Sequence, residues 1–203
     1  MHVLYLITDS AVPARIPEAV SCALRAAPPG SVLVQLRAKE CALQQLYDIA
    51  LELREVCTVH GAGLVVNDRT DLAQAVGADG VQLPERALPT RVVRHLLGER
   101  ALIGVSCHDA AGLSAAASGG ASFATLSPVY ASPGKGKPLG LPQFSALVRD
   151  AGLPVYALGG VDATRARALK AAGAAGVAVI SAVFGSQDPA TAVSDLLTAW
   201  NDP

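Results

Sequence analysis

The chain has 203 residues, of which 51% are apolar, 16% are charged and 4% are aromatic, and its formal net charge is −1. Such a composition can bury a large core and excludes an intrinsically disordered chain, while the balanced charge gives no electrostatic footprint for nucleic acid or a membrane surface. The four cysteines form no C-x-x-C pair, no apolar run could span a bilayer and no secretory signal is visible, so we expect reduced thiols and a cytoplasmic location.

Short β-branched runs alternate with helical patterns eight times along the chain. This alternation indicates βα units on a parallel sheet. The predicted strands are 3–8, 32–36, 64–67, 80–83, 102–106, 122–126, 155–158 and 176–180. The predicted helices are 17–26, 42–60, 69–76, 90–97, 110–118, 142–150, 163–171 and 189–200.

Eight βα units in about 200 residues are the minimal content of a closed barrel. We therefore predict an α/β protein with one domain over residues 1–203, a (β/α)8 TIM barrel. A doubly wound open sheet is the alternative. No G-x-G-x-x-G motif follows the first strand, which weakens the dinucleotide-binding form of that alternative.

One long segment, 127–140, cannot be explained by packing. It contains three glycines, three prolines and two lysines, so it can neither propagate a helix nor pair as a central strand. A long irregular connection in a compact domain is typical of a lid or binding loop, and its lysines suit an anion such as phosphate. The alternative is a solvated linker.

Polar residues at the C-terminal ends of the predicted strands are the candidate site residues, because barrels place their active sites there. Gln35, Arg37 and Lys39 alternate along one strand end, so they share a side that can face the barrel mouth, unless this is only a solvated strand end. Arg37 is suited to a bidentate grip on phosphate or carboxylate. The pair 159–160, both glycines, follows the seventh strand, where backbone N–H groups can approach a phosphate.

His108 is the one histidine of four that falls at the C-terminal end of a predicted strand. Histidine titrates near neutrality and can move protons in both directions, although a capping or packing role is the alternative. Cys107 beside it should point the opposite way, because side chains alternate along a strand.

Taken together, these residues resemble the thiamine phosphate synthase/TenI family, single-domain phosphate-binding (β/α)8 barrels of thiamine biosynthesis. The resemblance runs from Leu4 to about Gly185 and rests on segments 4–9, 34–39, 66–69, 77–81, 103–106, 127–130, 159–160 and 179–181. It implies that a pyrimidine diphosphate is held by Gln35, Arg37, Lys39, Asn67 and Lys135, and a thiazole phosphate by Gly160, Ile180 and Ser181. We add Ser106, Ser132 and Gly159 as further binding candidates from the same strand ends and loop.

One run departs from the synthase pattern. Synthases resemble one another in a His-x-Gly-Gln-(Asp/Glu)-Asp run after the fourth strand, whose last Asp joins the residue matching Asp68 on magnesium. Here the run reads Gln-Leu-Pro-Glu-Arg-Ala over 82–87, so Gln82 replaces the histidine and Ala87 the carboxylate. Magnesium usually takes one or two carboxylates together with substrate phosphates, so this loss predicts a weak metal site.

The same run resembles the TenI branch, whose members are thiazole tautomerases. We therefore predict an isomerase that converts a thiazole carboxylate phosphate to its aromatic tautomer, with no metal or cofactor. In this prediction His108 is the acid/base, Gly159, Gly160 and Ser181 anchor the phosphate, and Arg37 or Lys39 lies near the carboxylate.

Two alternatives stay open. The first is a magnesium-dependent thiamine phosphate synthase, a transferase that joins hydroxymethylpyrimidine diphosphate to thiazole phosphate and uses Asp68 for the metal. The second is a barrel that binds a thiamine-related phosphate to regulate and catalyses nothing. The expected partner is a small phosphorylated thiazole. Neither nucleic acid nor a membrane is expected, and a homo-oligomer is left open.

Overall fold

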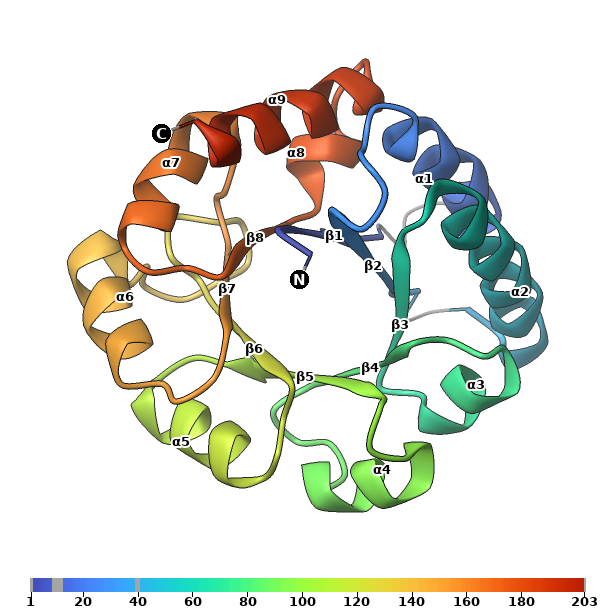
Figure 1. The fold of residues 1–203 in the computed structure, drawn as a ribbon, viewed down its shortest axis with the longest axis horizontal. Helices are drawn as coiled ribbons and strands as arrows, with labels where there is room; N and C mark the ends of the chain where they lie inside the picture. The colour runs from blue at the N-terminus through green and yellow to red at the C-terminus, as the bar shows by residue number, and fades with distance from the viewer. Residues whose placement is uncertain (1, 9–12, 39–40, 203) are drawn as a thin grey trace.

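A closed parallel barrel forms the centre of the protein (Figure 1). A computed structural model describes residues 2–8, 13–38 and 41–202, and within them eight strands pair in chain order, with β1 also pairing with β8. The strands are β1 (Leu4–Ile7), β2 (Val32–Leu36), β3 (Gly63–Asn67), β4 (Gly80–Leu83), β5 (Leu102–Cys107), β6 (Phe123–Leu126), β7 (Val155–Leu158) and β8 (Gly176–Val179). The predicted (β/α)8 fold is confirmed.

Helices surround the barrel on its outside (Figure 1). They are α1 (Ile16–Leu24), α2 (Leu43–His60), α3 (Thr70–Ala75), α4 (Thr90–Leu97), α5 (Ala110–Ser118), α6 (Gly140–Arg149), α7 (Ala163–Ala171), α8 (Ser181–Phe184) and α9 (Pro189–Asn201), with a 3-10 turn η1 (Pro13–Arg15) before α1. No predicted strand or helix boundary is more than two residues from the observed one. The short α8 and η1 were not predicted, because single turns carry no periodicity.

Side chains alternate between two cores, as a barrel requires. Those pointing inward form one cluster in the barrel, made of Tyr5, Ile7, Leu33, Val65, Phe123, Tyr156 and Ala178. Those pointing outward pack under the helices in a larger cluster. The rings of Tyr5, Phe123 and Tyr156 lie 5.3–5.6 Å apart between centroids and fill the barrel interior. The barrel is therefore a packed core, and ligands must bind at an end of it.

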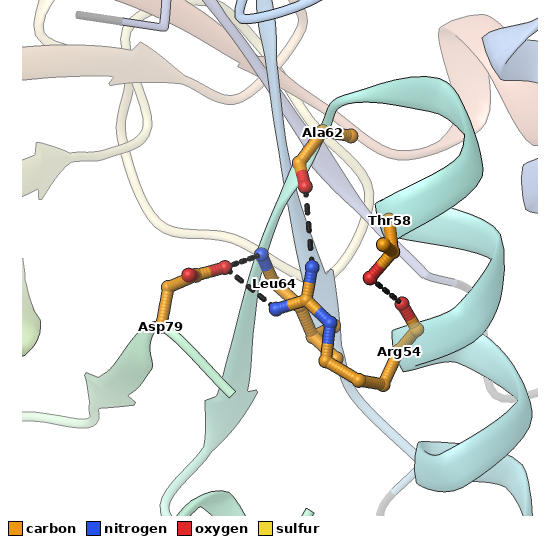
Figure 2. A network of polar contacts seen from close by, with 5 residues as sticks. All are labelled: Arg54, Thr58, Ala62, Leu64 and Asp79. Atoms are coloured by element: carbon orange, nitrogen blue, oxygen red, sulfur yellow. Dashed lines mark hydrogen bonds and ion pairs between the residues drawn. The ribbon is translucent and has the colours of Figure 1, made fainter. Parts of the chain in front are cut away.

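The N-terminal end of the barrel is fastened by one ion pair, shown in Figure 2. Asp79, at the turn into β4, accepts hydrogen bonds through Oδ2 from the Leu64 backbone N–H (2.7 Å) and from Arg54 of α2 (2.8 Å). Arg54 also donates to the Ala62 carbonyl at 3.5 Å. A hollow of about 580 Å³ at this end is lined by Asp79 among others. We call these contacts of Asp79 with Arg54 and Leu64 the clamp. Active sites of such barrels lie at the opposite, C-terminal end, so the clamp stabilises the fold and takes no part in ligand binding.

Among the helices of the described segments, none is both long and apolar enough to cross a bilayer. The cytoplasmic location and the open question of a homo-oligomer stay predictions.

Candidate functional site

A cavity of about 820 Å³ opens at the C-terminal end of the barrel. Nine of the predicted site residues line it, namely Gln35, Arg37, Asn67, Ser106, His108, Ser132, Lys135, Gly159 and Ile180. Gly160 and Ser181 are not in its lining, and Lys39 lies outside the described residues. The strand-end rule therefore brought most of the candidates to one place, while the role of each stays a prediction.

The cavity changes in character with depth. Its most buried polar side chains are uncharged: Gln35, Gln82, Thr125 and Ser127 are each 2–3% exposed. Charged side chains lie further out: Arg37 is half-buried, and Lys135, Asp68 and Glu85 are exposed. A neutral floor under a rim that carries Arg37 and Lys135 fits a ligand with an uncharged ring and a phosphate tail, because a buried charge without a partner is costly.

A chain of hydrogen bonds connects side chains at the floor of the cavity. Gln35 donates from Nε2 to the Tyr5 hydroxyl (2.6 Å), Tyr5 donates to Oε1 of Gln82 (2.9 Å), and Gln82 donates from Nε2 to Oγ of Ser106 (3.1 Å). The chain crosses four strands and leaves its buried members satisfied. Such networks rigidify the groups they join.

Arg37 is fixed through its backbone. The buried Thr8 hydroxyl accepts from the Arg37 N–H at 2.9 Å and donates to the Arg37 carbonyl at 3.1 Å. Gln35 and Arg37 both line the cavity, but so do Leu36 and Ala38, so the prediction that Gln35 and Arg37 share one side of the strand stays a prediction.

His108 lies beside the end of β5, and its Nδ1 is 2.6 Å from the Ser127 carbonyl oxygen. A carbonyl only accepts, so Nδ1 carries the proton and the neutral ring keeps Nε2 as an acceptor. Cys107 is buried in the outer core, as predicted from alternation along the strand. Burial also raises the pKa of the Cys107 thiol to about 11, which makes it a poor nucleophile near neutrality.

The Gly159–Gly160 turn is locked against the loop after β6. Both residues are in the left-handed region, with φ of 97° and 63°. A Cβ at Gly160 would lie 2.6 Å from the Ala131 carbonyl oxygen and 2.8 Å from Cβ of Tyr130. The Tyr130 N–H donates to the Gly159 carbonyl at 3.0 Å. Glycine is therefore required here by conformation and by space.

Arg165 of α7 supports the same turn. Its guanidinium donates to the Gly160 carbonyl, lies 4.5 Å from the centre of the Tyr130 ring and pairs with Asp162 at 3.7 Å. The loops after β6 and β7 are thereby held together next to the cavity.

Segment 127–139 contains neither helix nor strand, as predicted. Hydrogen bonds close its base, where the Leu139 and Gly140 N–H groups donate to the Pro128 and Val129 carbonyls, each at 2.9 Å. Lys135 from this loop lines the cavity, whereas Lys137 does not. The loop is thus a cavity wall that supplies one of its two lysines.

Ser181 begins α8 and is exposed, and Ile180 before it lines the cavity. Their part in holding a phosphate stays a prediction.

Two carboxylates, from Asp68 and Glu85, line the cavity together with the Asn67 amide. Asp68 has a φ of 57°, a left-handed conformation that Asp tolerates better than most residues and that often marks functional sites. In the described residues, no three His, Cys, Asp or Glu side chains gather closely enough to hold a metal by themselves. Magnesium is commonly held by one or two carboxylates and substrate phosphates, and these hard oxygen donors fit that arrangement.

Glu85 supplies a carboxylate that the prediction of a weak metal site, drawn from Ala87, did not count. Ala87 is not in the cavity lining, but Glu85, two residues earlier, is. Counting carboxylates by aligned position therefore underestimated the acidic groups that reach the cavity.

Thr125 and Ser127 are cavity residues that were not among the named candidates, and Arg69, a polar residue at the end of the third strand, lines the cavity as well. Alternation along β6 could have found the first two, because Phe123 points into the barrel and residues two and four further on must follow it. Arg69 is held by Asp71 through a two-point contact, with Nε 2.9 Å from Oδ1, and this hydrogen-bonded partner lowers the pKa of Asp71 to about 2.

The family comparison and the relatives in sequence point to one family. The family described as "Thiamine monophosphate synthase" matches residues 4–183. The "Thiamine biosynthesis bifunctional protein ThiM/ThiE" of Symbiobacterium thermophilum is 43% identical over 96% of this chain and 40% of its own length. The "Thiamine-phosphate synthase" of Gloeobacter violaceus is 41% identical over 97% of this chain and 55% of its own length. The chain thus spans about half of these two relatives.

A solved structure shows the same likeness over nearly the whole of both chains. "Thiamine phosphate pyrophosphorylase from Pyrococcus furiosus" superposes with a TM-score of 0.88 and 31% identity, covering 98% of this chain and 95% of the other.

These names overturn the prediction of a TenI-like tautomerase, since they specify the synthase and none singles out the TenI branch. The prediction was wrong because it gave a six-residue run more weight than the rest of the chain. His108 stays a cavity residue, without the acid/base role in thiazole isomerisation.

Proposed function

The chain belongs to the thiamine monophosphate synthase family, and on that premise we propose that it is a transferase that joins hydroxymethylpyrimidine diphosphate to thiazole phosphate. The observation that carries the proposal is the synthase name shared by relatives that are alike over almost all of this chain. In this reaction the bond between the pyrimidine methylene carbon and diphosphate breaks, and the same carbon bonds to the thiazole nitrogen.

The depth profile of the cavity supports an orientation for the first substrate. The uncharged pyrimidine ring lies on the neutral floor beside Gln35 and Ser106, and the diphosphate lies at the rim near Arg37, Asn67 and Lys135. Arg37 grips phosphate oxygens in two-point contacts, and Lys135 adds a point charge on a loop. At about 820 Å³ the cavity has the size of sites that hold drug-sized ligands.

The thiazole phosphate lies on the other side of the mouth. Gly159, Gly160, Ile180 and Ser181 follow β7 and β8, where the barrel commonly binds phosphate with backbone N–H groups. The locked Gly159–Gly160 turn supplies a rigid backbone for that contact. The two substrates then face each other across the barrel axis.

Catalysis in this arrangement is positioning and charge stabilisation. Holding both substrates in one cavity makes their encounter unimolecular, and the rim cations offset the charge that develops on the departing diphosphate. Magnesium, when bound, would add further neutralisation of that charge. Asp68 and Glu85 would hold it, with substrate oxygens completing its ligands.

Coupling of the two substrates, followed as thiamine phosphate formed with and without magnesium, tests the proposal. We expect turnover that depends on magnesium. A folded protein that binds thiamine phosphate yet forms none from the two substrates would refute it and favour a regulator.

Two lysine variants sharpen this test. Lys135→Ala should raise the KM for the pyrimidine diphosphate, whereas Lys137→Ala, in the same loop but outside the cavity lining, should leave it unchanged. Equal effects would mean that only the net charge of the loop matters.

A further inference from the structure

We infer that Tyr5 and Gln82 are positioning residues of the pyrimidine site, which direct the Ser106 hydroxyl proton toward the ligand. The inference rests on the proposed function for the identity of that ligand. It concerns the hydrogen-bonded chain of Gln35, Tyr5, Gln82 and Ser106: Gln35, Gln82 and Ser106 line the cavity, while Tyr5, between Gln35 and Gln82, does not.

Every bond in the chain runs in the same direction. Gln35 donates to Tyr5, so the single Tyr5 proton is directed to Gln82, whose Oε1 accepts it. The Gln82 carbonyl end is thereby turned toward Tyr5, and its Nε2 donates to Ser106. Amide orientation is set by such neighbours, and here the Tyr5 hydroxyl sets it.

Ser106 at the end of the chain accepts through Oγ and keeps its own proton. In the described part of the chain no acceptor is assigned to that proton, and Ser106 lines the cavity. The hydroxyl can therefore donate to an acceptor such as a ring nitrogen of a heteroaromatic ligand. Without Gln82 as donor, the Ser106 hydroxyl would be free to rotate between donating and accepting.

The surroundings keep this arrangement in place. Tyr5 is fully buried, and burial raises the pKa of its phenol far above the ordinary range, so the hydroxyl stays protonated wherever the protein is folded. Gly104, below Ser106 on the same side of β5, leaves the space that the Gln82 amide occupies, because a Cβ there would overlap Oε1 of Gln82 and the Phe123 ring. Cooperative chains of this kind strengthen each member.

A purely structural role would also explain a buried hydroxyl, and Tyr156 offers a matched control. It lies in the same aromatic cluster, 5.6 Å from Tyr5 between ring centroids, and it is 2% exposed. Its hydroxyl donates in the opposite direction, to the His2 carbonyl at 2.6 Å. Tyr5→Phe and Tyr156→Phe thus remove the same atom from the same cluster, but only the first interrupts the chain under the cavity.

The test measures binding with two probes, hydroxymethylpyrimidine diphosphate and inorganic diphosphate, by calorimetry on the full chain. Tyr5→Phe should weaken the pyrimidine diphosphate by roughly tenfold, the effect of one hydrogen bond of ordinary strength. Inorganic diphosphate, which reaches only the rim, should bind unchanged. Gln82→Met, a second variant of similar volume, should reproduce this pattern, and Tyr156→Phe should change neither affinity.

The remaining outcomes overturn either the inference or the proposed function. Equal losses for both probes, no loss in Tyr5→Phe, or the same loss in Tyr156→Phe would overturn the inference in favour of general packing. A wild-type chain that binds the pyrimidine diphosphate no tighter than inorganic diphosphate would overturn it as well. Selective losses in the variants, together with a wild-type chain that couples no substrates, would refute the proposed function and leave the positioning role standing.

Discussion

Replacing Gly160 by alanine is the most direct test of the locked turn beside the cavity. Two penalties apply. A left-handed φ of 63° costs an alanine roughly 1–2 kcal/mol, which its stiffer unfolded chain offsets by about 0.4–1 kcal/mol. The new Cβ would also lie 2.6 Å from the Ala131 carbonyl oxygen, and overpacking of this kind costs about 1–3 kcal/mol. Together these terms predict a loss of about 1–4.5 kcal/mol in the free energy of unfolding.

The control is Gly77→Ala. Gly77 has nearly the same φ, 62°, but nothing lies within 4 Å of a Cβ built there, so only the first penalty applies. Thermal denaturation followed by circular dichroism measures both variants, and each kcal/mol should lower the Tm by roughly 2–4 °C in a chain of this size. Thiazole phosphate should bind more weakly in Gly160→Ala alone. If the two variants lost equal stability, the contact between the two loops would not be as tight as described.

Three further changes test other parts of the chain. Asp68→Asn should abolish, and Glu85→Gln should reduce, the gain in inorganic diphosphate affinity on adding magnesium; an unchanged gain in titrations of both variants would exclude these ligands. Asp79→Ala should lose about 1–3 kcal/mol in urea unfolding, because the Leu64 N–H loses its acceptor, and Arg54→Ala about 1 kcal/mol or less; the reverse order would contradict the clamp. Burial raises the pKa of Cys57 to about 12, so the folded state favours the neutral thiol and stability should fall as pH rises from about 9 toward 12. Cys57→Ala should flatten that fall, and an unchanged slope would show that other groups cause it.

Part of the site could be predicted because barrels follow a simple geometric rule. Alternation along a strand placed Cys107 in the outer core, and the position at a strand end placed Gln35 and Arg37 at the cavity. The position after a strand end brought Ser106 and His108 to the mouth.

The choice between two related activities could not be made from a short run of residues. The run after β4 showed the loss of a carboxylate at Ala87, but not that the side chain of Glu85 reaches the same cavity. The path of a loop depends on how it packs. A carboxylate two positions away from the expected one, such as Glu85, can therefore reach the cavity in its place.

Local pattern alone determined the eight βα units and the glycine-rich segment after β6, because strand and helix periodicity and the backbone limits of glycine and proline act over a few residues. Only the tertiary structure decided how the floor of the cavity is built. Tyr5 and Gln82 are 77 residues apart, and Ser106 is a further 24 residues along the chain. They meet because closure of the barrel brings distant strands together around one axis. Strand periodicity predicts which side chains point inward, but it does not predict which of them contact each other inside the barrel.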